Sequence, residues 1–404
     1  MYKHLIFILI LLLMFSCNTQ NKQYPPPPVI ADRGVVFMGQ ERTDYQSCAF
    51  PALCVTPGGR WVCAFRAAPL KTPLEGQHVL LTWSDDEGRS WRKPFTPFIP
   101  QAIDGKAGLF RTACLTPLGG RRLLAAICWV DNSEPGLPFF NEETEGLLDT
   151  RLFLSWSDDD GETWSEPQLV DTSPYNVPTA ITGPVLRFSD GELALQFELN
   201  KHYNDLSVWH HASVMMFSRD GGNTWPRHTL ASSDPENSVF YWDQRPSVAN
   251  GSILDVFWTF DREKSIYLNM HMRESDDRGE TWSEMWDTGI PGQPSAPQRL
   301  PDGKIALCYV DRTAATIIKM RVSDDGGKTW PECTELTVFG STSGSQSENK
   351  KSMQDAWSEM SKFSIGLPAA TLLPGGDILV VYYAGPETDV TGIHWARITF
   401  PNED

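Results

Sequence analysis

The chain has 404 residues and a formal net charge of −17, and 41% of its residues are hydrophobic. That hydrophobic fraction is enough for a sizeable core, whereas the acidic balance excludes a protein that binds nucleic acid through a basic face. The 31 glycines, 30 prolines and 15 tryptophans favour a β-rich fold with short strands and many turns.

The N-terminus has the features of a targeting segment. Lys3 precedes an apolar run over residues 5–15, which is too short to cross a membrane as a helix. Cys17 follows this run in a loose lipobox, so we expect residues 1–16 to be a lipoprotein signal peptide. Residues 17–33 would then be a lipidated cysteine and a proline-rich tether, with a plain secretory leader as the alternative. The lipoprotein hypothesis places the protein in the bacterial cell envelope, facing the outer membrane or periplasm and attached to a membrane through Cys17.

An eight-residue pattern of Ser, Asp, Gly, Thr or Ser, and Trp at fixed positions occurs five times. The copies begin at Ser84, Ser157, Ser218, Ser275 and Ser323. In each copy the Asp side chain can cap the amides of a tight turn, and the Gly can adopt a positive φ. The Trp ring can be buried between neighbouring sheets. The pattern therefore predicts a repeated outer turn.

Hairpin signals alternate with these boxes. Six turns rich in Gly, Asn, Asp and Pro separate pairs of apolar strands, at residues 57–59, 118–120, 189–191, 249–251, 301–303 and 374–376. Six hairpins and five boxes predict one all-β domain over residues 34–404, a six-bladed β-propeller. The last blade lacks a box, and we expect a strand at 35–38 to complete it from the other end of the chain.

The chain resembles the sialidase superfamily, whose propellers carry these Asp boxes. The resemblance covers nearly all of residues 34–404 and implies a sialidase-like six-bladed fold, but the boxes indicate the fold more than the activity. Where sialidases have the arginine of an Arg-Ile-Pro motif, this chain has Ala49. It has Leu367 in place of the nucleophilic Tyr, Thr182 near the place of its glutamate partner, and residues 75–78 in place of the acid/base Asp. The sequence predicts a divergent member without the usual catalytic set.

Candidate site residues lie where ligands bind in propellers, at the beginnings of the inner strands and the ends of the second strands. Two carboxylates can supply the acid and base for glycoside cleavage. We predict catalytic roles for Glu198 and Asp243, followed by Asp261, and we consider His78 a proton carrier in place of the missing Asp.

Arginine forks among these residues can bind a sugar carboxylate bidentately. Gln293 also enters an inner strand. The predicted substrate-binding residues are Arg66, Arg111, Gln244, Arg245, Arg262, Asp131, Asp311, Arg312 and Tyr383. The alternative for the Asp-Arg pairs at 261–262 and 311–312 is a purely structural ion pair.

The predicted function is hydrolysis of a terminal, acidic sugar from glycans or polysaccharides by an exo-acting sialidase-like glycosidase. A non-catalytic glycan- or protein-binding propeller and a polysaccharide lyase are the alternatives. No cofactor and no metal are expected, because no CxxC or other metal-ligand spacing occurs. The seven cysteines after Cys17 are expected to be mostly buried free thiols.

Overall fold

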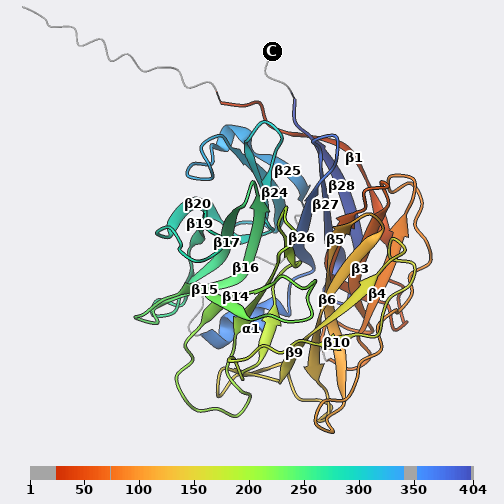
Figure 1. Ribbon diagram of the computed structural model, residues 1–404, viewed down its shortest axis with the longest axis vertical. Coiled ribbons are helices and arrows are strands. Elements are labelled where there is room, and N and C mark those ends of the chain that lie inside the picture. Colours follow the sequence, from red (N-terminus) through yellow and green to blue (C-terminus); the bar gives the residue numbers. More distant parts are fainter. Residues whose placement is uncertain (1–23, 73, 341–352, 402–404) are drawn as a thin grey trace, which may run out of the picture.

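The computed structural model describes residues 24–72, 74–340 and 353–401. Cys17 and the predicted signal peptide lie outside these residues. Strands dominate the described chain, whose helical elements are α1 (Met353–Met360) and a 3-10 turn (Glu332–Thr334). In this part of the chain no helix has the length and apolar character needed to span a bilayer. The strands are arranged as a β-propeller (Figure 1).

Four separate antiparallel sheets form part of the ring. The first contains β5 (Gly108–Gly119), β6 (Arg122–Asp131), β9 (Thr150–Ser157) and β10 (Gln168–Leu169). The second contains β11 (Thr179–Ile181), β12 (Leu186–Arg187), β13 (Leu193–Leu199), β14 (Ala212–Ser218) and β15 (Arg227–Ser233). The third contains β16 (Val239–Ala249), β17 (Ser252–Asp261), β18 (Ile266–Tyr267), β19 (Asn269–Ser275) and β20 (Trp286–Pro291). The fourth contains β21 (Gln293–Pro294), β22 (Gln298–Arg299), β23 (Ile305–Asp311), β24 (Ile317–Ser323) and β25 (Leu336–Gly340).

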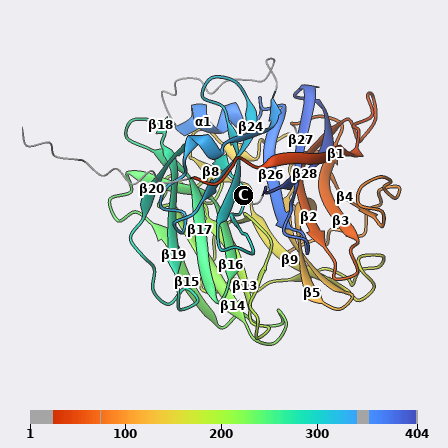
Figure 2. The same ribbon diagram turned by 90° about the horizontal axis from the view of Figure 1, so that it is seen from above.

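A seven-stranded sheet forms the rest of the ring, where the sequence predicted two separate blades. Its strands are β26 (Ile365–Leu372), β27 (Ile378–Glu387), β28 (Val390–Thr399), β1 (Val29–Phe37), β2 (Ser47–Val55), β3 (Trp61–Ala68) and β4 (His78–Ser84). One parallel pairing, Ser47 with Thr391, joins β2 to β28. The Thr391 hydroxyl strengthens this joint, since it accepts the Cys48 N–H at 2.8 Å and donates to the Cys48 carbonyl at 2.6 Å. The two ends of the chain therefore meet within one sheet (Figure 2).

The N-terminal strand closes the ring as expected, because β1 pairs antiparallel with β28. The strand begins at Val29, opposite Thr399, so it includes residues that the sequence assigned to the tether. The first strands of successive units also contact one another around the ring, from β2 through β5, β12, β16 and β21 to β26 and back to β2. A short hairpin of β7 (Phe140–Asn141) and β8 (Gly146–Leu147) lies outside the main sheets.

The Asp boxes form the predicted turns. In the second copy, the Asp159 carboxylate accepts the Thr163 N–H at 2.8 Å and the Thr163 hydroxyl at 2.5 Å. The Gly161 N–H donates to Ser157 Oγ at 2.9 Å, and Gly161 has a φ of 88°. The Trp164 ring packs edge-on against Phe98, at 5.4 Å between centroids. Each box thus links a turn to the packing between sheets.

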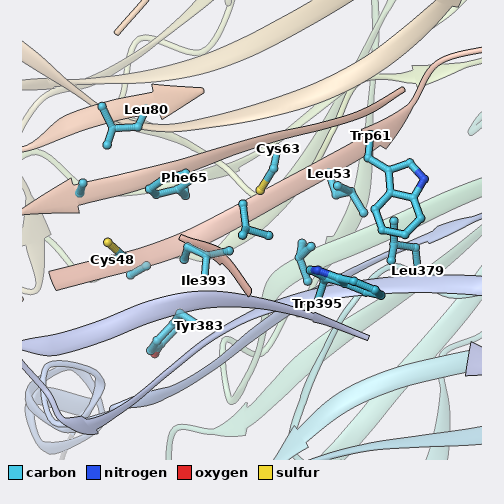
Figure 3. Close-up of a cluster of buried hydrophobic side chains, with 14 of the residues drawn as sticks. Cys48, Leu53, Trp61, Cys63, Phe65, Leu80, Leu379, Tyr383, Ile393 and Trp395 are labelled. Atoms are coloured by element: carbon cyan, nitrogen blue, oxygen red, sulfur yellow. The ribbon is translucent and has the colours of Figure 1, made fainter. Parts of the chain in front are cut away.

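The core consists of apolar side chains between neighbouring sheets. Figure 3 shows one cluster, in which Trp61 of β3 and Trp395 of β28 meet edge-on at 5.2 Å between centroids. Cys48 and Cys63 belong to this cluster as free thiols. Of the seven cysteines after Cys17, all are free and five are buried, while Cys333 is exposed. The expectation of mostly buried free thiols is confirmed.

Candidate functional site

Bulges interrupt four first strands near their beginnings, at the end of the ring that we call the mouth. The register shifts at equivalent places in four first strands, between Ala49 and Ala52, Phe110 and Thr112, Trp242 and Arg245, and Gly366 and Ala369. Bulges of this kind re-aim side chains. Arg111 and Asp243 lie within two of them, and Asp243 has a φ of 52°. Two of the interrupted ladders thus supply side chains to the site.

Two carboxylates, Glu198 of β13 and Asp243 of β16, form the acidic side of the mouth. We call them the carboxylate pair. Glu198 Oε1 accepts the backbone N–H of Asp243. Asp243 itself pairs with Arg245, with 2.6 Å between Oδ1 and Nη2, and accepts Gln293 Nε2 at 2.8 Å. Burial raises the pKa of Asp243, and the charge of Glu198 raises it further, while Arg245 opposes both.

Gln293 connects the carboxylate pair to Arg312. Its Oε1 accepts Arg312 Nη1 at 3.0 Å. Arg312 also donates from Nη2 to the Ile365 carbonyl at 3.2 Å, and its guanidinium lies 3.8 Å from the centroid of the Phe363 ring. The side chain is buried, so this geometry is fixed from several sides. Arg312 therefore holds a defined place between the acidic side and Tyr383.

The Tyr383 hydroxyl lies on the other side of Arg312. Lys71 Nζ donates to this hydroxyl at 3.1 Å and to the Phe363 carbonyl at 2.6 Å. Arg66, fully buried on β3, donates to the Lys71 carbonyl at 2.9 Å and to Gln77 Oε1 at 2.9 Å. A second group of basic side chains thus surrounds the phenol.

Arg111 completes this group from β5. Its guanidinium lies between two aromatic rings, 5.2 Å from the centroid of Phe50 and 4.4 Å from that of Phe139. Such contacts favour a guanidinium that is partly removed from water. We call four residues the cation cluster: Arg66, Lys71, Arg111 and Arg312.

The cation cluster has no carboxylate partner among the described residues, since none of their ion pairs includes any of its four members. Burial is the main cause that lowers the pKa of all four groups. Mutual repulsion adds to it, because the charge of Arg111 lowers the pKa of Arg66. Buried charges are normally paired, so this arrangement is suited to an anionic group supplied from outside.

The groups at the mouth come largely from second strands. Ala49, which stands where sialidases have arginine, pairs in register with Arg66 of β3. Glu198 of β13 pairs with Ala180, and Tyr383 of β27 pairs with Gly366. Cross-strand partners share one face of a sheet. Arg66 therefore lies opposite Ala49, Tyr383 lies opposite the neighbour of Leu367, and Glu198 lies opposite a residue two positions from Thr182.

Three predicted carboxylates lie outside this connected group. Each accepts a backbone N–H from a residue two or three positions later and pairs with a lysine. The pairs are Asp131–Lys106 at 2.8 Å, Asp261–Lys264 at 2.8 Å and Asp311–Lys319 at 3.1 Å. They cap turns at strand ends, and the structure does not bring them to the carboxylate pair.

Three other predicted residues are held by different partners. Gln244 donates to Asp255 at 2.6 Å inside the sheet, where burial raises the pKa of Asp255 to about 8. Arg262 pairs with Glu145 at 2.9 Å. His78 lies on β4, one register position beyond Arg66, opposite Ala67. The side chains of these three residues do not join the contacts that run from Glu198 to Lys71, whereas the Gln244 backbone N–H donates to Glu198 Oε1 at 3.4 Å.

Lys71 is the main residue that sequence reasoning missed. It lies in the loop after β3, a segment with no motif and no strand periodicity. Its backbone N–H donates to Asp389 at 2.7 Å, from a turn more than 300 residues later in the chain. Long-range contacts such as this one place Lys71 in the site, and a single sequence gives no signal for them.

Comparisons with known proteins define the family. A family model described as a BNR repeat-like domain matches residues 138–355, more than half of the 404 residues. The chain belongs to the BNR repeat-like family. A search of curated proteins finds no match.

Solved structures show that this BNR repeat-like chain has the sialidase-like fold. A Dyadobacter fermentans protein described as of unknown function has a TM-score of 0.69 at 20% identity, covering 93% of this chain and all of that one. An intramolecular trans-sialidase from Ruminococcus gnavus has a TM-score of 0.59 at 15% identity, covering 91% and 98%. The NanB sialidase of Streptococcus pneumoniae has a TM-score of 0.60 at 12% identity, covering 91% and 70%. At these identities the likeness shows the fold alone.

Proposed function

We propose that the protein is an exo-acting glycosidase that removes a terminal acidic sugar from glycans or polysaccharides. One observation carries the proposal: the cation cluster, in which Arg66 and Arg312 are buried and the other two are half-buried, has no carboxylate partner among the described residues and lies next to the carboxylate pair. Arginine forks bind sugar carboxylates, and paired carboxylates cleave glycosidic bonds. Both kinds of group surround one mouth, so a single sugar can meet both.

The two carboxylates have different surroundings, which suit different roles. Burial raises the pKa of Asp243, which suits a carboxyl that donates a proton to the leaving oxygen. Glu198 accepts backbone N–H groups, as suits an ionised carboxylate that acts as base or nucleophile. The arginines and Lys71 would hold the acidic group of the sugar.

We also infer that the ring has six blades. The ladder between β2 and β28 contains a single residue pair, Ser47–Thr391, so β2–β4 and β26–β28 with β1 can be counted as separate blades. Six first strands or strand pairs then surround one axis.

We further propose that Cys17 carries a lipid in the cell envelope. Val29 pairs with Thr399, at the opposite end of β28 from Ile393, the partner of Tyr383. A membrane anchor at this end would leave the mouth pointing away from the membrane. Mass spectrometry of the mature N-terminus tests the lipid, since an unmodified residue 17 would contradict it.

Glycan digestion tests the enzyme directly. The domain from residue 24 onward is incubated with sialylated, uronate-bearing and neutral glycans, and mass spectrometry identifies the products. We expect release of an acidic monosaccharide, with at least about a hundredfold loss of rate in Glu198→Gln and Asp243→Asn. Asp131→Asn, a carboxylate in a turn at the end of β6, is the matched control and should keep the rate.

Other outcomes identify other functions. Unsaturated products that absorb in the ultraviolet would show a lyase, and binding without any product would show a glycan-binding propeller. Full activity in both carboxylate variants would refute the assignment of Glu198 and Asp243.

A further inference from the structure

The side-chain amine of Lys71 makes its hydrogen bonds to residues that lie far from its own loop in the sequence. It donates to the Phe363 carbonyl at 2.6 Å and to the Tyr383 hydroxyl at 3.1 Å, and it lies 4.4 Å from the centroid of the Tyr383 ring. Tyr383 is fully buried in the cluster of Figure 3. Two hydrogen bonds to neutral oxygens match the two N–H groups of an uncharged amine.

Charged groups around Lys71 oppose a positive charge on it. Burial is the main cause that lowers its pKa well below the ordinary value, followed by the charges of Arg66, Arg312 and Arg111. Asp389 acts in the opposite direction, but its carboxylate accepts the backbone N–H of Lys71. A guanidinium stays charged in proteins whereas a lysine can lose its proton, so among these groups the amine is the one that can release and take up a proton.

We propose that Lys71 is a further ligand-binding residue whose amine takes up one proton when an anionic sugar group binds beside Arg66 and Arg312. The ligand brings a negative charge to a cluster that has no ion-paired carboxylate among the described residues, and this charge favours the ammonium form. The proton comes from solvent and bonds to the lone pair of Nζ, and no bond of the ligand breaks. The third N–H formed in this way can donate to the anion. The proposal rests on the proposed function for the acidic nature of the ligand.

A pH dependence of affinity follows, and its sign is fixed by linkage. Where free Lys71 is neutral and bound Lys71 is charged, binding consumes a proton, so affinity falls as pH rises. The fall should reach about tenfold per pH unit. Below the pKa of the free amine the affinity should no longer depend on this group.

Isothermal titration calorimetry with glucuronate measures the proton directly. The protein is titrated at one pH in buffers of different ionisation enthalpy, and the slope of observed heat against that enthalpy gives the protons taken up. We expect close to one proton for the native protein and for Lys93→Met, an exposed lysine used as control. We expect none for Lys71→Met, which should bind more weakly, and none for Lys71→Arg, which keeps a permanent charge.

The outcomes separate this inference from the proposed function. Binding of glucuronate without proton uptake, or equal uptake in Lys71→Arg, would overturn the role of Lys71 alone. If glucuronate and sialic acid both fail to bind the native protein, the acidic-sugar function and the role of Lys71 fail together. Lys71→Arg retains a charged side chain, so it tests the proton even if Lys71→Met unfolds.

Discussion

The substitution Gly366→Ala should damage the site without removing any of its functional groups. A Cβ atom at Gly366 would lie 2.5 Å from Nη2 of Arg312 and 3.1 Å from the hydroxyl oxygen of Tyr383. Optimal contacts between such atoms are about 3.5 Å, so the guanidinium has to move by about 1 Å. The backbone of Gly366 itself is not in the left-handed region that favours glycine. The new methyl group is therefore the whole perturbation.

The expected loss follows from the hydrogen bonds of Arg312. Its bonds to Gln293 at 3.0 Å and to the Ile365 carbonyl at 3.2 Å cannot both survive such a shift. A hydrogen bond to a charged group contributes about 1.5–3 kcal/mol. If the displaced fork loses one such bond to the ligand, affinity for an acidic sugar should fall by about tenfold to 150-fold.

Calorimetry with glucuronate, together with thermal unfolding, tests this expectation. Gly375→Ala is the matched control, because a Cβ atom there would meet nothing within 4 Å and its φ is also unrestricted. We expect Gly375→Ala to bind like the native protein. Native affinity in Gly366→Ala would show that the position of Arg312 does not govern binding, and the reasoning would then be wrong.

Three further predictions concern stability and pH. Burial raises the pKa of Asp255 to about 8. The contribution of Asp255 to the free energy of unfolding is therefore complete below about pH 4 and is lost as pH rises to about 8. Denaturant unfolding of Asp255→Asn should not show this loss of stability between about pH 4 and about pH 8. In Gly108→Ala the new Cβ would lie 1.9 Å from the Trp129 ring, so chemical denaturation should show a loss of about 2 kcal/mol or more. Arg245 lowers the pKa of Asp243 against the effect of burial. In Arg245→Met, the limb of the pH–rate profile that reports Asp243 should therefore move to higher pH. An unmoved limb would exclude this ion pair.

Much of the fold could be predicted because its signals are local. A box such as 157–164 forms its turn from hydrogen bonds within a few residues, so the pattern alone identifies it. The strand at 35–38 could also be inferred to pair with the end of the chain. Joining of the first and last units into one sheet depends on Thr391 and Cys48, 343 residues apart, and no local pattern encodes that contact.

The site was predicted only in part, because the end of a strand indicates where a side chain lies but not which way it points. The same strand-end reasoning selected Glu198 and Asp131. Glu198 reaches across to the backbone of the next blade, whereas Asp131 turns to Lys106 and caps its own turn. Lys71 lies on a loop, and its contact with Tyr383, far away in the sequence, has no local signal. Long-range contacts of this kind decide which strand-end charges meet.

A comparison of matched ligands tests the central claim most directly. Glucuronate carries a carboxylate that glucose lacks, and sialic acid carries a negative charge that its methyl ester lacks. Calorimetry gives the affinity of each of these four ligands. We predict that each acid binds at least about tenfold more tightly than its neutral partner, and that Arg312→Met removes the difference. Equal affinities within both pairs would contradict an acidic-sugar site at the cation cluster.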